Sequence, residues 1–264
     1  MPFVQNQDVS IYFEDTGEGM PLVLGHSFLC SGKMWREQVP ALANHYRVVN
    51  VDFRGHGRSG EVKQPFTLYD AVSDVVAVLD ECGIEKAIWC GLSVGGMVAM
   101  RAAITRPERV AGLILLDTDA GAEHPFRKLK YHLMGMGARA LGIKPFLSPI
   151  SRLMFGASTR RQKRALVSEW KDEFATVHVP SILRSLEGLM QRDSVLARLP
   201  EISVPSLVVV GEEDQSLPPA ASRQIHERLP NSTFAEIPGA GHLSTLEQPE
   251  AVNRAILDFL ETSF

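Results

Sequence analysis

Short apolar runs recur along the chain, and each has the length of a strand that is buried on both faces of a sheet. The longer runs are residues 21–25, 46–51, 87–91, 110–116 and 204–211, and weaker ones lie at 9–14 and 232–237. Three further segments, 67–82, 95–105 and 251–260, carry apolar residues at helical spacing. Strands that alternate with helices pair in parallel through right-handed crossovers. The pattern therefore predicts the α/β fold class, with an open parallel sheet covered by helices on both faces.

The alternation stops after Asp119. From about residue 122 to residue 198 the chain shows no buried strand, only helix-like pieces interrupted by glycine and proline. The strand pattern then resumes at residue 204. We therefore predict an α/β core formed by residues 1–121 and 199–264, which carries a helical cap insertion at residues 122–198.

Composition and charge narrow the function classes. The chain has 264 residues, 45% of them hydrophobic, and a formal net charge of −4, which gives no reason to expect nucleic-acid binding. Its longest uncharged stretch, residues 87–100, is shorter than the ~20 apolar residues of a membrane span, and residues 1–10 lack the pattern of a secretory signal. Three cysteines (Cys30, Cys82, Cys90) are too few for a disulfide scaffold. We expect a soluble, cytoplasmic protein with no nucleic-acid or membrane partner.

Charge is divided unevenly between the two predicted parts. Residues 122–199 hold 14 Lys and Arg against six Asp and Glu, so the rest of the chain is net acidic. The pairs Arg160-Arg161 and Lys163-Arg164 are most simply a solvated helix face. The alternative is a positive rim that favours anionic substrates.

The turn Gly91-Leu92-Ser93-Val94-Gly95 stands between a predicted strand and a predicted helix. In that context a G-x-S-x-G sequence holds the serine in a tight, strained bend, and the glycines leave room for neighbouring backbone. The hydroxyl is then presented at the carboxyl edge of the sheet, beside a helix N-terminus that favours developing negative charge. We predict that Ser93 is a nucleophile.

A serine nucleophile needs a base to accept its proton and a third group to orient that base. Asp214 follows a predicted buried strand, and His242 follows the last short strand among small residues. We predict His242 as general base and then general acid, and Asp214 as the carboxylate that fixes its tautomer. Asp117 and Asp119 also end a predicted strand and remain alternatives for the acid.

Acyl transfer also requires backbone N–H groups that point at the charge developing on the carbonyl oxygen. One donor is expected directly after the nucleophile, at Val94, and the other from the loop after an earlier strand. That loop is Leu24-Gly25-His26-Ser27-Phe28-Leu29, and we predict the N–H of Phe28 as the second oxyanion-hole donor. His26 is interpreted as a residue that braces this loop.

Together these motifs resemble the α/β-hydrolase superfamily over nearly the whole chain. The resemblance is carried by Gly25-His26-Ser27-Phe28, Asp52-Phe53-Arg54-Gly55-His56-Gly57-Arg58-Ser59, the turn around Ser93, Asp214 and His242. Within the superfamily, the 3-oxoadipate enol-lactonase and arylesterase branch is similar at Met34-Trp35, Gln38-Val39-Pro40-Ala41-Leu42, Gly239-Ala240-Gly241-His242-Leu243-Ser244 and Glu247-Gln248-Pro249-Glu250. The resemblance implies an eight-stranded, mostly parallel sheet with a helical cap over the pocket. The usual His-Gly pair of the oxyanion loop is His26-Ser27 here.

These residues predict a serine hydrolase that cleaves carboxylic esters or lactones, with a small-molecule ester or lactone as its partner and no metal or other cofactor. A dehalogenase or epoxide hydrolase of this fold would carry aspartate where Ser93 stands, and neither metal-ligand spacing nor a dinucleotide motif is present. The alternatives are a C–C bond hydrolase of vinylogous ketoacids with the same triad, a haloperoxidase or perhydrolase side reaction, and a non-catalytic receptor for a small ligand.

The predicted insertion is rich in large apolar residues, which either line a substrate pocket or form the insertion's own core. They are Phe126, Leu129, Leu133, Met134, Met136, Phe146, Leu147, Leu153, Met154, Phe155 and Trp170. The sequence does not distinguish these two roles, and it leaves the natural substrate and the oligomeric state open.

Overall fold

The sheet is built from the predicted apolar runs. The computed structural model describes residues 2–264. Eight strands lie in the order β1-β2-β4-β3-β5-β6-β7-β8, with β1 and β2 antiparallel to their neighbours and the other pairs parallel. Their bounds are β1 Phe3–Asn6, β2 Val9–Thr16, β3 Pro21–Gly25, β4 Arg47–Val51, β5 Ala87–Leu92, β6 Val110–Leu116, β7 Ser206–Gly211 and β8 Ser232–Ile237. The predicted fold class is confirmed, with the eight-stranded, mostly parallel sheet that the family resemblance implied.

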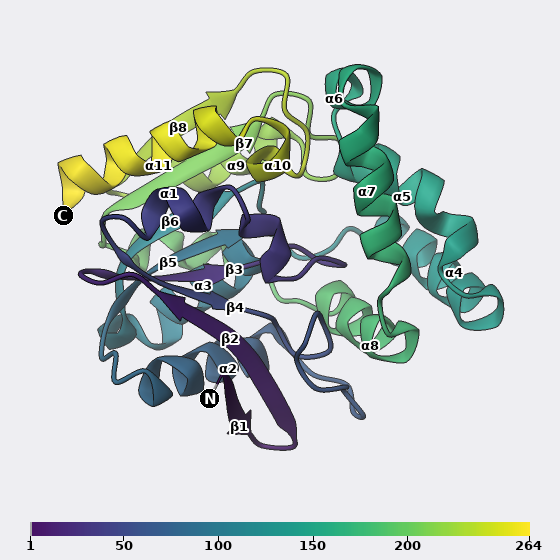
Figure 1. Ribbon diagram of the computed structural model, residues 1–264, viewed down its shortest axis with the longest axis horizontal. Helices are drawn as coiled ribbons and strands as arrows, with labels where there is room; N and C mark the ends of the chain where they lie inside the picture. The colour runs from purple at the N-terminus through teal and green to yellow at the C-terminus, as the bar shows by residue number, and fades with distance from the viewer. Residues whose placement is uncertain (1) are drawn as a thin grey trace.

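Helices cover both faces of the sheet (Figure 1). Alternate residues of β3 enter two separate cores: Val23 packs with one layer of helices, whereas Leu22 and Leu24 pack with the opposite layer. The core helices are α1 Gln38–Leu42, α2 Leu68–Glu81, α3 Val94–Thr105, α9 Pro219–His226, α10 Ser244–Glu247 and α11 Pro249–Ser263, with 3₁₀ turns at Gly32–Trp35, Pro107–Arg109 and Leu196–Glu201. Burial on both faces explains why the strands read as continuous apolar runs.

Helix α2 shows how local sequence sets an element's ends. The hydroxyl of Thr67 accepts the N–H of Asp70, and the Asp70 carboxylate accepts the N–H of Thr67 at 2.6 Å, which is a capping box. At the other end Gly83 has a φ of 66°, which glycine adopts without a Cβ penalty. The helix therefore occupies the segment that its apolar spacing predicts.

Residues 122–198 contain no strand and lie together at one end of the sheet, away from the C-terminus (Figure 1). Their helices are α4 Pro125–Leu141, α5 Leu147–Met154, α6 Ala157–Gln162, α7 Arg164–Ala175 and α8 Val179–Met190, with a 3₁₀ turn at Lys144–Phe146. The Leu243 N–H donates to Met154 O at 3.1 Å, so this helical segment is joined to the loop that follows β8. Within residues 2–264, no helix combines the length and the apolar character that crossing a bilayer requires.

The apolar residues of this segment divide into three groups rather than two. Met134, Phe146, Leu153 and Met154 line a cavity, and Phe155 and Trp170 are buried in the core. Neither expected role holds for four residues of α4, whose exposed fractions are large: Phe126 80%, Leu129 58%, Leu133 55% and Met136 53%. The prediction for these four was wrong because helical spacing reveals an apolar stripe without revealing whether anything packs on it.

Candidate active site

Ser93 occupies the sharp turn between β5 and α3. Its backbone has φ 57° and ψ −111°, a conformation that side chains other than glycine rarely adopt. The bend is possible because no side chain separates the adjoining backbones: a Cβ built on Gly95 would lie 2.1 Å from the carbonyl oxygen of Gly25. Thr118, two residues after β6, donates its hydroxyl to Ser93 O at 2.6 Å. The strained turn is thereby fixed from two neighbouring strands.

His242 and Asp214 meet Ser93 in a row of hydrogen bonds. The Ser93 Oγ lies 3.0 Å from Nε2 of His242, and Nδ1 of His242 lies 2.8 Å from Oδ2 of Asp214. The three residues follow β5, β7 and β8, whose carboxyl ends share one edge of the sheet. All three side chains are buried, so water does not compete for these contacts.

The orientation of the Asp214 carboxylate is set by backbone. Its Oδ1 accepts the N–H groups of Ser216 at 2.8 Å and Leu217 at 3.0 Å, which leaves Oδ2 for His242. Because a carboxylate only accepts hydrogen bonds, Nδ1 of His242 carries the proton and Nε2 presents its lone pair to Ser93. The arrangement suits Nε2 for removing the hydroxyl proton.

Neither alternative acid bonds to the histidine. Oδ1 of Asp117 accepts the Gly211 N–H at 2.7 Å and its Oδ2 accepts the hydroxyl of Ser244, while Asp119 lies 3.3 Å from a guanidinium nitrogen of Arg192. Asp117 is fully buried, and this burial, followed by the charge of Asp214, raises the pKa of its carboxyl well above the ordinary value.

The electrostatics around His242 favour its charged form. Burial by itself would lower the pKa of the imidazole, but the carboxylate of Asp214, and beyond it those of Asp117 and Glu247, raise that pKa above its ordinary value. A base with a raised pKa takes the serine proton more readily, provided the pH keeps it neutral beforehand.

The loop after β3 forms a tight turn beside Ser93. The Cys30 N–H donates to Ser27 O at 3.1 Å, and Leu29 inside the turn has a φ of 65°. His26 braces the loop, because its Nδ1 lies 2.8 Å from Ser27 O and its Nε2 accepts the Phe53 N–H at 2.9 Å. Burial lowers the pKa of His26 to about 4, so it stays neutral in this bracing role. The turn contains Phe28, the residue predicted as an oxyanion-hole donor.

Glu247 supports the histidine loop in a way that the sequence did not reveal. It is fully buried and accepts the N–H groups of Gly156 at 2.9 Å and Leu243 at 3.2 Å. One carboxylate therefore joins the helical segment 122–198 to the residue next to His242. Its only signal in the sequence was membership of the run Glu247-Gln248-Pro249-Glu250.

A cavity of about 140 Å³ adjoins the serine and the histidine. Its walls are mainly apolar and come from the Phe28 loop and from helices α4, α5 and α8. Arg192 lines it too, but its charge is matched by Glu123 at 2.9 Å. Arg127, whose Nη1 donates to Ser216 O at 3.1 Å, has no carboxylate within ion-pair distance among residues 2–264.

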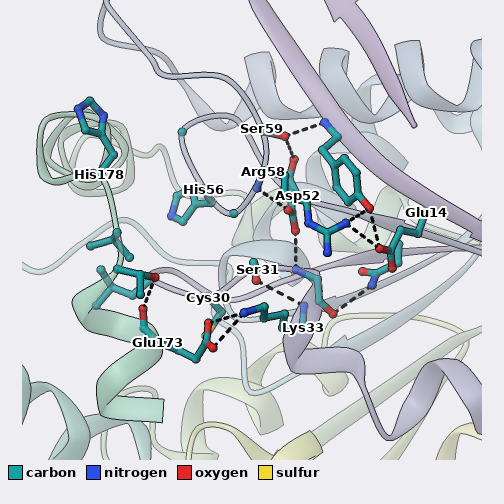
Figure 2. Close-up of a pocket in the computed structure, with 18 of the residues that line it drawn as sticks. Glu14, Cys30, Ser31, Lys33, Asp52, His56, Arg58, Ser59, Glu173 and His178 are labelled. Atoms are coloured by element: carbon teal, nitrogen blue, oxygen red, sulfur yellow. Dashed lines mark hydrogen bonds and ion pairs between the residues drawn. The ribbon is translucent and has the colours of Figure 1, made fainter. Parts of the chain in front are cut away.

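A second, wider cavity of about 770 Å³ lies where the helical segment meets the core (Figure 2). Two pairs of its charged groups lie close to each other: Lys33 is 3.0 Å from Glu173, and Arg58 is 3.3 Å from Glu14. Ser93 does not line this cavity. Its larger volume therefore does not make it the site of the chemistry.

Within residues 2–264 no three His, Cys, Asp or Glu side chains are grouped as metal ligands would be. The chemistry that the arrangement offers is that of a hydroxyl, an imidazole and a carboxylate in one row, next to a small apolar cavity. Such a row removes a proton from the hydroxyl and returns it to a leaving group.

Comparisons with known proteins show which family the fold belongs to. Residues 20–249 match the family model described as the alpha/beta hydrolase fold. The chain is 27% identical to a putative carbamate hydrolase, RutD, of Azorhizobium caulinodans over 98% of both chains. Among solved structures it is similar to a thermophilic esterase from Thermogutta terrifontis (30% identity, TM-score 0.93, 99% of this chain and 97% of that one). It is also similar to the enol-lactonase of Burkholderia xenovorans LB400 (26% identity, TM-score 0.92, 98% and 100%).

Proposed function

The chain belongs to the alpha/beta hydrolase fold family, and we propose that it is a serine hydrolase that cleaves carboxylic esters or lactones through an acyl-enzyme on Ser93. The observation that carries this proposal is the unbroken row of hydrogen bonds from Ser93 through His242 to Asp214 beside an apolar cavity. An esterase and an enol-lactonase among the similar structures support the same substrate class.

The first half of the reaction forms the acyl-enzyme. His242 Nε2 takes the proton from Ser93 Oγ as the oxygen attacks the substrate carbonyl. The carbonyl oxygen becomes an oxyanion, which the N–H groups of Val94 and Phe28 hold. Val94 is suited to this role because it is the first residue of α3, where N–H groups have no partner within the helix. His242 then gives its proton to the alkoxide oxygen as the bond between the carbonyl carbon and that oxygen breaks.

The second half releases the acid. A water molecule gives a proton to His242 Nε2 and attacks the acyl carbon, and the second tetrahedral intermediate collapses when His242 returns the proton to Ser93 Oγ. Asp214 remains ionised throughout and stabilises the imidazolium in both halves. For a lactone the alkoxide and the acyl group are parts of one molecule, so a single hydroxy acid leaves.

The cavity limits the size of the substrate. Its volume of about 140 Å³ is close to that of engineered cavities that hold benzene. We therefore assign the enzyme to short-chain esters and small lactones, whose acyl part fits between Phe28 and the walls contributed by α4 and α5.

The test is Ser93→Ala with p-nitrophenyl acetate as substrate, alongside Ser73→Ala on the exposed surface of α2 as a matched control. Loss of one triad member reduces turnover about ten-thousandfold or more, whereas the control should match the wild type. Near-normal turnover by Ser93→Ala would reject the assignment. Stoichiometric labelling of Ser93 by a fluorophosphonate without sustained turnover of any short ester or lactone would instead identify a receptor.

A further inference from the structure

Helix α4 carries an apolar face that no other part of residues 2–264 covers. Phe126, Leu129, Leu133 and Met136 follow one another at intervals of three or four residues, so they lie on one side of the helix. All four are exposed, and none belongs to either core. A row of large exposed apolar side chains on one helix marks an interaction surface.

The polar residues of α4 identify the kind of partner. The helix contains four Lys and Arg and no Asp or Glu. Lys128, Lys130 and Arg139 make no ion pair with any carboxylate in the described part of the chain. Their charges are therefore available to a partner, and that partner must be negative where it meets the edges of the apolar face.

We propose that α4 is a docking helix that lies flat on an anionic lipid surface, with its exposed apolar residues in the boundary between headgroups and acyl chains. An apolar face with cationic edges is the pattern of helices that bind in the plane of a bilayer. The expectation that the protein has no membrane partner came from the absence of a spanning segment, which does not bear on a helix that lies on the surface.

A second copy of this chain fits the same surface less well. A symmetric contact would place α4 against α4, and the unpaired lysines and arginines of both copies would then face one another without a carboxylate on either helix. A bilayer that contains phosphatidylglycerol supplies both the apolar interior and the negative headgroups.

The opposite side of α4 gives docking a consequence for the reaction. Tyr131, Met134 and Ala138 line the catalytic cavity. A single helix therefore separates the lipid surface from the catalytic cavity, and small lipophilic esters concentrated in the bilayer become the favoured substrates. This last step rests on the proposed function, whereas docking itself does not.

The test is sedimentation of the full chain with vesicles of phosphatidylcholine alone or of phosphatidylcholine mixed with phosphatidylglycerol. We expect binding to the mixed vesicles only, and its loss in high salt. The double variant Lys128→Gln/Lys130→Gln should lower the partition coefficient about thirtyfold, because each lysine near an anionic surface strengthens binding about fivefold. The control variant Lys63→Gln/Lys86→Gln removes the same charge from two exposed positions outside residues 122–198, and it should bind as the wild type does.

A second variant separates the apolar contribution. Leu129→Gln/Leu133→Gln should abolish vesicle binding and leave the turnover of water-soluble p-nitrophenyl acetate unchanged, since neither leucine lines the cavity. The proposal is overturned if the wild type ignores the mixed vesicles, or if binding survives both double variants. It is also overturned if the wild type forms a dimer and binds no vesicles, and if Leu129→Gln/Leu133→Gln converts that dimer to a monomer. A failure of Ser93→Ala to lose activity would refute the proposed chemistry and leave docking intact.

Discussion

Asp214→Asn tests the catalytic geometry with almost no change in shape. Oδ1 of Asp214 accepts two backbone N–H groups, from Ser216 and Leu217. An amide nitrogen cannot accept them, so the asparagine must place its oxygen there and turn its NH₂ toward His242. The imidazole Nδ1 must then act as acceptor, and the proton moves to Nε2.

The wrong tautomer has a calculable cost. With a proton on Nε2, His242 donates to Ser93 Oγ and has no lone pair for the serine proton. A change of this kind reduces turnover about ten-thousandfold, which corresponds to roughly 5 kcal/mol in the activation barrier. The two backbone bonds are kept, so we expect stability to change much less than activity.

The assay is steady-state hydrolysis of p-nitrophenyl acetate together with urea unfolding of the same preparations. A variant that retains activity within tenfold of the wild type would refute the reasoning, because it would show that the carboxylate does not set the tautomer. A variant that loses activity only because it unfolds would show a parallel fall in the urea midpoint. Asp117→Asn is the matched control, since it changes a nearby buried carboxyl that does not bond to His242.

Two further predictions follow from the neighbours of the triad. Asp117→Asn should keep turnover near that of the wild type above neutral pH but move the acid limb of the kcat/KM profile to lower pH. The reason is that the charge of Asp117 is one of those that raise the pKa of His242. An acid limb at the same pH as in the wild type would contradict this. The pKa of Asp117 is higher in the folded than in the unfolded state, so the wild type loses stability as pH rises from about 4 toward that raised pKa. Urea unfolding should show that Asp117→Asn loses less stability over the same pH range. Gly95→Ala should cost about 1–3 kcal/mol of stability and lower kcat, because the added Cβ would meet the backbone of Gly25. A variant whose unfolding and turnover match those of the wild type would show that this close approach is not required.

Local signals in the sequence were sufficient to predict most of the core and the sharp turn at Ser93. The turn around Ser93 is specified within a few residues, since the strand before it, the glycines and the helix after it are contiguous. His242 and Asp214 could be placed because polar residues after parallel strands gather at one sheet edge. Edge strand β1 was missed, because its four residues are alternately half-buried and exposed and lack an apolar run.

What the sequence could not supply was pairing between distant segments. Asp117 and Asp214 both follow a buried strand, and only the folded chain shows that Asp214 faces the imidazole while Asp117 faces Ser244. The same limit applies to α4, where an apolar stripe and an unpaired lysine are invisible until every neighbour has been placed. Burial and charge compensation are properties of the assembled molecule.

The separation of Ser93 and His242 along the chain also has a consequence for biosynthesis. Ser93 precedes His242 by 149 residues. A ribosome that adds about 5–20 residues per second must therefore work for about 7–30 s after Ser93 has been made before His242 exists. Under the proposed mechanism, the growing polypeptide carries an unactivated Ser93 hydroxyl throughout this interval, and a product truncated before β8 would lack the base that ester cleavage requires.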